Sequence, residues 1–163
     1  MKSPRVGVGA GIDLHGRETP EGFAVEEQTV RLPLSGICSN GVPVETSILT
    51  PHPYAWLNMK IQAAHDWLRM ERGEIERKVN SEKHIIDVYI LTAMMLETEL
   101  TEAVDLALRY SGHPVARQIH ACARELYGTV ESPGVQEVRR QARDEIDYPL
   151  FWEALCEALG IIA

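Results

Sequence analysis

The stretch from Pro51 to Tyr89 constrains the fold most, because it contains the two clearest helical patterns in the chain. In its first part, apolar residues recur at steps of three and four, the spacing that lines side chains along one face of a helix. These residues are Tyr54, Leu57, Ile61, Ala64 and Leu68. Pro53 suits the first turn of such a helix, where its missing amide hydrogen costs no hydrogen bond. We therefore predict a helix that packs this face against a core.

Two ionisable residues stand out in these patterns. Lys60 borders the apolar face of the first helix, where its ammonium group could contact phosphate oxygens or simply extend past the core into water. Asp87 lies among isoleucine and valine residues in the second pattern, where an apolar residue would be expected. It could form a surface ion pair with Lys83, one helical turn earlier, or take a functional or buried hydrogen-bonding role. The sequence leaves both alternatives open for each residue.

The composition limits the classes of protein that fit. A chain of 163 residues is long enough for one compact core. Its net charge of -8 disfavours nucleic-acid binding, which usually requires a basic surface. The chain starts without the apolar run of a secretory signal, and no stretch approaches the roughly 20 apolar residues that cross a bilayer. Because its three cysteines are also scattered and lack a CxxC pair, we expect a cytoplasmic protein with reduced thiols and no membrane partner.

The first 50 residues have the composition of short strands. Gly7, Gly9 and Gly11 suggest a nucleotide-binding loop, but that fingerprint needs a strand before it and a helix after it, and here a turn follows. We predict instead that the glycines of the extended segment 4–15 mark either a strand that packs closely against a neighbour or a flexible, incomplete end. Asn40-Gly41 is a strong hairpin signal, because both residues tolerate a positive φ angle. Residues 29–34 are therefore predicted to pair antiparallel with residues 42–49.

The rest of the chain is predicted to be helical. Thr50 is a candidate N-cap for the first helix and Ser81 for the second, which would then begin at Glu82. Further helical patterns follow, bounded by residues that start or stop helices. These signals are Thr98, Gly112, Gly128, Ser132-Pro133 and Asp147. The predicted fold class is α+β, with a small, mostly antiparallel sheet in residues 1–50 and a helical bundle in residues 51–163 packed on it.

Asp13 is the candidate metal ligand. It alternates with Ile12 and Leu14 on the predicted strand, so its carboxylate would point to one face, where it could bind magnesium beside other carboxylates. A single carboxylate does not make a magnesium site, so this role requires further acids nearby. His15 would share the same face as a ligand or proton donor, or would be a solvated strand end.

The order of these elements resembles the later half of the nucleotidyltransferase-fold family related to AbiEii toxins and minimal nucleotidyltransferases. The stretches that carry the resemblance are IDLH, VETSILTP, LNMKIQAAHDW and KHIIDVYIL, within roughly residues 8–96. In that family a helix with a lysine follows a strand and a proline-containing turn, and the next helix has a basic and acidic start with an aspartate one turn further on. Lys60, Lys83 and Asp87 match these positions, and Asp13 matches the family's third metal-binding carboxylate.

The resemblance implies transfer of a nucleoside monophosphate from a nucleoside triphosphate to an acceptor, with Mg²⁺ as cofactor. It makes Asp13, Lys60 and Asp87 the expected catalytic residues and Asp13 the expected metal ligand. It makes Lys60 and Lys83 the expected contacts to the nucleotide.

Two departures from the family change what we expect of this chain alone. The family's Gly-Ser loop and its paired Asp-x-Asp carboxylates would precede residue 1, and His84 stands where the family commonly has an acid. We therefore expect a truncated or inactive nucleotidyltransferase-like protein. The alternative is a helical protein-interaction module, such as a regulatory or antitoxin-like partner. An exposed N-terminal strand could also pair with a second copy to form a homodimer.

Overall fold

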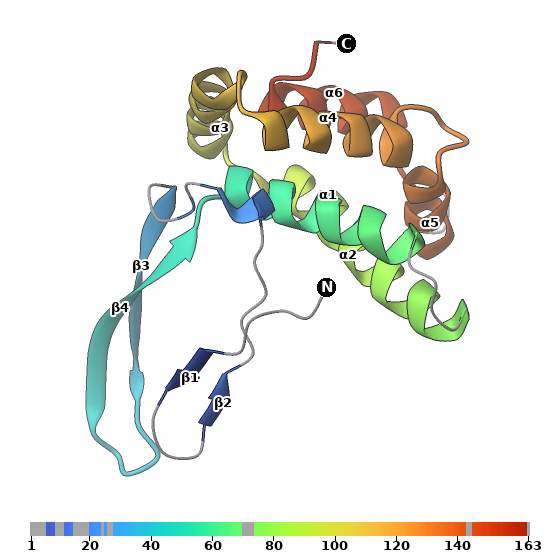
Figure 1. Cartoon of the computed structure of the whole chain (residues 1–163). Coiled ribbons are helices and arrows are strands. Elements are labelled where there is room, and N and C mark those ends of the chain that lie inside the picture. The colour runs from blue at the N-terminus through green and yellow to red at the C-terminus, as the bar shows by residue number, and fades with distance from the viewer. Residues whose placement is uncertain are drawn as a thin grey trace.

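The computed structural model describes residues 6–8, 12–14, 20–23, 25, 28–69, 74–142 and 145–162, with β1, β2, residue 21 and residues 74–78 described by their backbone alone. It confirms the predicted α+β class, because its described residues form two antiparallel two-stranded sheets followed by six helices (Figure 1). The elements are β1 (Val6–Val8), β2 (Ile12–Leu14), the 3-10 turn η1 (Pro20–Gly22), β3 (Thr29–Ile37), β4 (Pro43–Pro51), α1 (Pro53–Arg69), α2 (Glu74–Met94), α3 (Glu97–Tyr110), α4 (Pro114–Tyr127), α5 (Pro133–Gln141) and α6 (Tyr148–Leu159).

Strands β3 and β4 form the predicted hairpin, here called the β3–β4 ribbon. β3 begins at Thr29 as predicted but continues to Ile37, and β4 begins one residue later than predicted and continues to Pro51. Its register runs from Thr29 opposite Pro51 to Ile37 opposite Pro43. At the turn, the side-chain oxygen of Asn40 accepts a hydrogen bond of 3.1 Å from the amide of Val42. Gly41 has a φ of 82°, a conformation that glycine adopts without steric cost. The Asn40-Gly41 signal therefore predicted the turn correctly.

The β3–β4 ribbon extends away from the packed helices (Figure 1). Residues directly opposite each other share a face, so alternation places four apolar residues on one side of the ribbon. This apolar face consists of Leu32, Leu34, Val44 and Ile48, which are between 38% and 47% exposed. The other side is mixed: it carries Arg31, Ser35, Glu45 and Ser47, with a hydrogen bond of 2.7 Å from Arg31 to the hydroxyl of Ser47, together with the exposed Leu49 and Ile37. A ribbon of two strands thus leaves an apolar face open to solvent.

Helix α1 begins at Pro53, as predicted, but its N-cap is His52 and not Thr50. Thr50 is part of β4, because pairing continues to Pro51. The Nδ1 atom of His52 accepts a hydrogen bond of 3.1 Å from the amide of Tyr54. The predicted apolar face of α1 is buried through Ala64, and Leu57 and Ile61 have no exposed surface. Burial of each of these two side chains contributes about 1.5–3 kcal/mol to stability.

Helix α2 begins at Glu74, so the prediction of a start at Glu82 after an N-cap at Ser81 was wrong. Ser81 is instead buried within the helix. The residues between Glu74 and Ser81 are rich in glutamate, lysine and arginine, which are good helix formers, so the helix starts before the predicted cap. Residues 70–73, which precede α2, lie outside the described residues.

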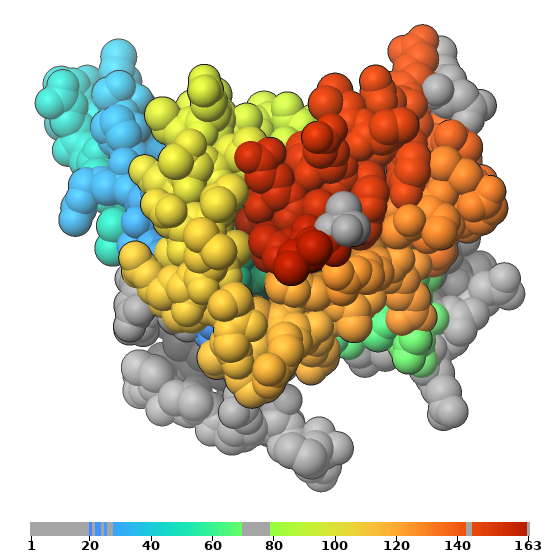
Figure 2. Space-filling view, turned by 90° about the horizontal axis from the view of Figure 1, so that it is seen from above, coloured from blue at the N-terminus to red at the C-terminus, as the bar shows by residue number. Residues whose placement is uncertain are grey.

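Helices α3 to α6 complete the bundle with limits close to the predicted signals. The side chain of Asp147 caps α6 by accepting from the amide of Leu150 at 3.1 Å, and Gly160 ends α6 with a φ of 67°. Viewed from above, α6 occupies the middle of one face, with α3 and α4 on either side of it (Figure 2). The core joins the inner faces of all six helices, and the three cysteines are unpaired. None of the described helices is long and apolar enough to cross a membrane.

Candidate functional site

Lys60 and Asp87, selected separately from the sequence, form an ion pair between neighbouring helices. Lys60 comes from α1 and Asp87 from α2, and the distance from Nζ to Oδ2 is 2.5 Å. The side chains are 19% and 30% exposed, so the pair is partly shielded but within reach of a ligand. Of the alternatives left open for Asp87, an ion pair with Lys83 is not found among the described residues, and Lys83 is exposed. Packing of α1 on α2 therefore creates the pair.

Two further residues lie beside this ion pair, and neither was among the expected site residues. The ring of Trp56 lies 5.4 Å from Nζ of Lys60, within the range of a cation–π interaction. His84 contributes a neutral imidazole, because burial, followed by the positive charge of Lys60, lowers its pKa. Its Nδ1 atom is buried and has no hydrogen-bond partner. Trp56 is four residues before Lys60 and His84 three before Asp87, so helical spacing is the signal that would have found them.

The charge of Asp87 also reaches the buried core. Tyr127 is completely buried, and its hydroxyl donates a hydrogen bond of 3.3 Å to the carbonyl of Ile85. Burial raises the pKa of Tyr127 first, and the negative charge of Asp87 raises it further. Tyr127 therefore acts as a neutral hydrogen-bond donor that holds α4 against α2.

The predicted role of Asp13 stays a prediction. Asp13 lies in β2 opposite Gly7 of β1, and its side chain is outside the part of the chain that the structure describes. His15 also lies outside the described residues. Among the described side chains, no group of three histidine, cysteine, aspartate or glutamate residues is close enough to hold a metal ion. The expected magnesium ligand, Asp13, is outside these side chains, so the magnesium site stays a prediction and we derive no step through a metal.

Comparison of the chain with protein-family models, with curated proteins and with solved structures found no match in any of the three. Functional reasoning therefore starts from the geometry around Lys60 and Asp87. The arrangement offers one ammonium group fixed by a carboxylate, beside an aromatic ring and a neutral imidazole. Such a group can bind an anion, since it keeps donor hydrogens that the carboxylate does not use.

Proposed function

We propose that this chain is a nucleotidyltransferase-like protein that binds a nucleoside triphosphate, with Lys60 contacting the phosphates. The observation that carries the proposal is the 2.5 Å contact between Lys60 and Asp87, which are 27 residues apart in sequence. Both residues match positions of the family that the sequence resembles. The two residues were selected from the sequence for different reasons, and the fold brings them into contact at a partly buried position.

The chemistry of the pair suits phosphate binding. A lysine ammonium group has three donors, so one can remain on Asp87 while the others contact phosphate oxygens. Asp87 would hold Lys60 in place, and the exposed Lys83 on the same helix would add a second positive charge. The proposal extends to binding only. Nucleotidyl transfer would need a set of metal-binding carboxylates, of which Asp13 is the candidate member.

Isothermal titration calorimetry of the full chain with ATP, GTP, CTP and UTP, each with magnesium, tests the proposal. We expect saturable binding of at least one nucleotide and a loss of about tenfold or more for Lys60→Gln, the usual worth of a hydrogen bond to a charged group. Arg117→Gln, which changes an exposed residue of α4, serves as the charge-matched control and should bind normally.

Loss of Lys60 leaves Asp87 without its partner, so the single variant could bind poorly because it is less stable. The double variant Lys60→Gln with Asp87→Asn replaces the ion pair by two neutral amides and separates the two effects. It should retain the far-ultraviolet circular dichroism of the unmodified chain and still bind poorly. Unchanged affinity in a folded double variant, or no binding of any of the four nucleotides by the unmodified chain, would refute the proposal.

A nucleotidyl-transfer assay tests whether the chain alone also catalyses the reaction. With nucleoside triphosphates labelled at the α-phosphate and with magnesium, we expect the chain alone to form no labelled product. A labelled product that disappears in Asp13→Ala would show that the chain is an active enzyme and that binding alone is too narrow a description.

A second candidate function, protein interaction, is favoured by one specific observation. The apolar face of the β3–β4 ribbon is open to solvent on the described part of the chain, and surfaces of this kind usually bind another protein. This candidate corresponds to a regulatory or antitoxin-like module and does not require Lys60. A strictly monomeric chain that captures no partner in a pull-down would count against this candidate.

A further inference from the structure

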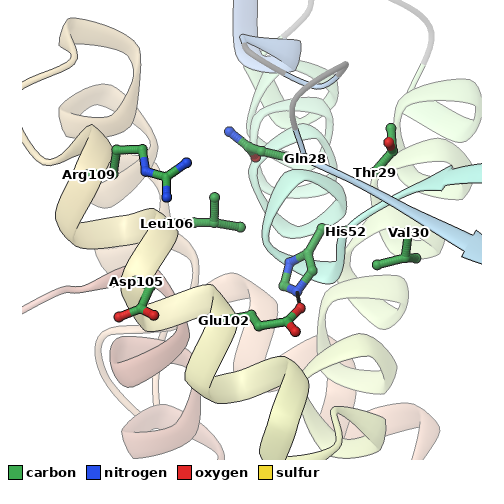
Figure 3. Close-up of a pocket in the computed structure, with 8 residues that line it drawn as sticks. All are labelled: Gln28, Thr29, Val30, His52, Glu102, Asp105, Leu106 and Arg109. Carbon is green, nitrogen blue, oxygen red and sulfur yellow. Dashed lines mark ion pairs between the residues drawn. The ribbon is translucent and has the colours of Figure 1, made fainter.

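A cavity of about 230 Å³ lies between α3, the beginning of β3 and the residue that precedes α1. It is separate from the Lys60–Asp87 pair. The side chains that matter for its chemistry are Gln28, His52, Glu102, Asp105, Leu106 and Arg109 (Figure 3). They belong to segments that are far apart in sequence, so the cavity exists only in the folded chain.

The inner wall of this cavity carries an amide with unused hydrogen-bonding capacity. Gln28 is 3% exposed, and neither its amide nitrogen nor its amide oxygen has a hydrogen-bond partner. Its backbone is fixed, because the amide of His52 donates a hydrogen bond of 2.6 Å to the carbonyl of Gln28. Buried amide groups are nearly always hydrogen-bonded, so an unpartnered one that faces a cavity indicates a missing partner.

His52 supplies a second donor on the same wall. Its Nδ1 atom accepts a hydrogen bond from the amide of Tyr54, so the proton of the neutral ring is on Nε2. That Nε2 atom lies 3.3 Å from a carboxylate oxygen of Glu102 without hydrogen-bond geometry. The ring of His52 therefore sets the Glu102 carboxylate at the edge of the cavity, where its exposed side chain can turn toward a ligand.

Helix α3 forms the outer wall with residues that share one helical face. Glu102, Asp105, Leu106 and Arg109 follow the spacing i, i+3, i+4 and i+7. Asp105 and Arg109 have the spacing of a helical ion pair, yet no ion pair joins these two described residues. In Figure 3, Arg109 and the amide of Gln28 lie toward one end of the cavity, Glu102, Asp105 and His52 lie toward the other, and Leu106 lies between.

We propose that this cavity binds a small zwitterion, the chemistry of a free amino acid. The ammonium group of the ligand contacts Glu102 and Asp105, and its carboxylate contacts Arg109. The amide of Gln28 donates to the carboxylate and accepts from the ammonium group, which satisfies both of its unpartnered atoms. A phosphate ligand is disfavoured, because the two carboxylates of Glu102 and Asp105 would repel it and only the guanidinium of Arg109 would attract it. A simple cation is disfavoured, because it would make no contact with Arg109. The proposal does not depend on the function proposed for Lys60.

The test is a titration of the full chain, followed by nuclear magnetic resonance, with zwitterions whose charges are increasingly far apart. The probes are glycine, β-alanine and 4-aminobutyrate, and the single-charge analogues are butylamine and butyrate. We expect saturable shifts of residues around the cavity with at least one zwitterion, at an affinity about tenfold or more above that of either analogue, because only the zwitterion uses both ends.

Two variants distinguish a binding site from a structural feature. Gln28→Leu should fold at least as stably as the unmodified chain, because it removes an unsatisfied buried amide, but it should weaken zwitterion binding about tenfold. Arg109→Gln should weaken binding to a similar extent, whereas Arg117→Gln, an exposed arginine on α4, should bind normally. The proposal is overturned if no zwitterion binds up to millimolar concentration, if the analogues bind equally well, or if both folded variants keep full affinity.

Discussion

His52 joins three parts of the molecule through one side chain. It caps α1 through Nδ1, holds the backbone of Gln28 through its amide, and lies beside Glu102 of α3. Burial lowers its pKa, and the nearby carboxylates of Glu102 and Glu99 only partly oppose this shift. The folded state therefore prefers the neutral ring, and a protonated Nδ1 could no longer accept the hydrogen bond that caps α1.

This preference predicts a pH dependence of stability. Because the pKa of His52 is lower in the folded than in the unfolded chain, the unfolded chain binds the proton first as the pH falls below about 6.5. His52 thus lowers the free energy of unfolding across the range between its unfolded and folded pKa values, by at most about 1.4 kcal/mol per pH unit. His52→Asn keeps a capping acceptor but does not titrate, so urea unfolding from pH 7.5 to pH 5 should show a shallower loss. An equal loss in both proteins would contradict the prediction.

Individual residues of the candidate sites differ in how far the sequence predicts them. Periodicity selected Lys60 as a residue at the border of a core and Asp87 as a misplaced carboxylate, but it could not pair them. Their contact depends on the rotation of α1 and α2 about their axes, which is set by packing across the bundle. No pattern in the sequence around Gln28 indicated a binding residue, because the charged residues across the cavity from it lie on α3, more than 70 residues later in the chain.

Among the elements, the contact of α5 with the end of α4 is unusually close. Gly134 lies in the first turn of α5 and is buried. A Cβ atom at this position would lie 2.5 Å from Cε1 of Tyr127 and 2.6 Å from the carbonyl oxygen of Leu126. The second neighbour is backbone and cannot rotate away. The absence of a side chain at Gly134 therefore sets the distance between the two helices.

Gly134→Ala should lower the free energy of unfolding by about 1–3 kcal/mol, the usual cost of overpacking a core. Gly112→Ala is the matched control, because a Cβ atom there meets nothing within 4 Å and the change should stay within about 0.5 kcal/mol. Urea unfolding followed by circular dichroism measures both. Equal stabilities of the two variants would mean that α5 moves freely relative to α4.

The ends of helices and strands were predicted correctly where a residue fixes the turn by its own backbone conformation. They were predicted wrongly where strand pairing or helix propensity extends an element past a residue that could have ended it. Asn40 and Gly41 specify the β3–β4 turn by their own conformations. Thr50 had the side chain of an N-cap, but strand pairing to Pro51 placed it in β4. Ser81 likewise had a capping side chain, and the helix formers before it carried α2 back to Glu74.

At the scale of the whole molecule, a packed helical body carries an extended ribbon whose apolar face has no ionisable side chain. A two-stranded ribbon is only marginally stable in water without a covering element. The net charge of -8 opposes self-association in general, but the charges of Arg31 and Glu45 lie on the other face of the ribbon, so no charged side chain would be buried if this face packed on a copy of itself. The occupant that fits best is therefore the same face of a second copy, which would pack around a twofold axis.

This arrangement predicts self-association through the ribbon. The double variant Leu32→Lys with Ile48→Glu places an opposite-charge pair on the apolar face at directly paired positions, so the ribbon is kept while the face loses its apolar character. Ser35→Lys, opposite Glu45 on the other face, is the control. In sedimentation velocity experiments from 1 to about 100 µM, we expect concentration-dependent dimers for the unmodified chain and for Ser35→Lys.

The double variant should remain monomeric, because a dimer would have to bury its new charges. A monomeric unmodified chain throughout this range would reject the second copy as occupant, and dimers of equal strength in the double variant would place the interface elsewhere.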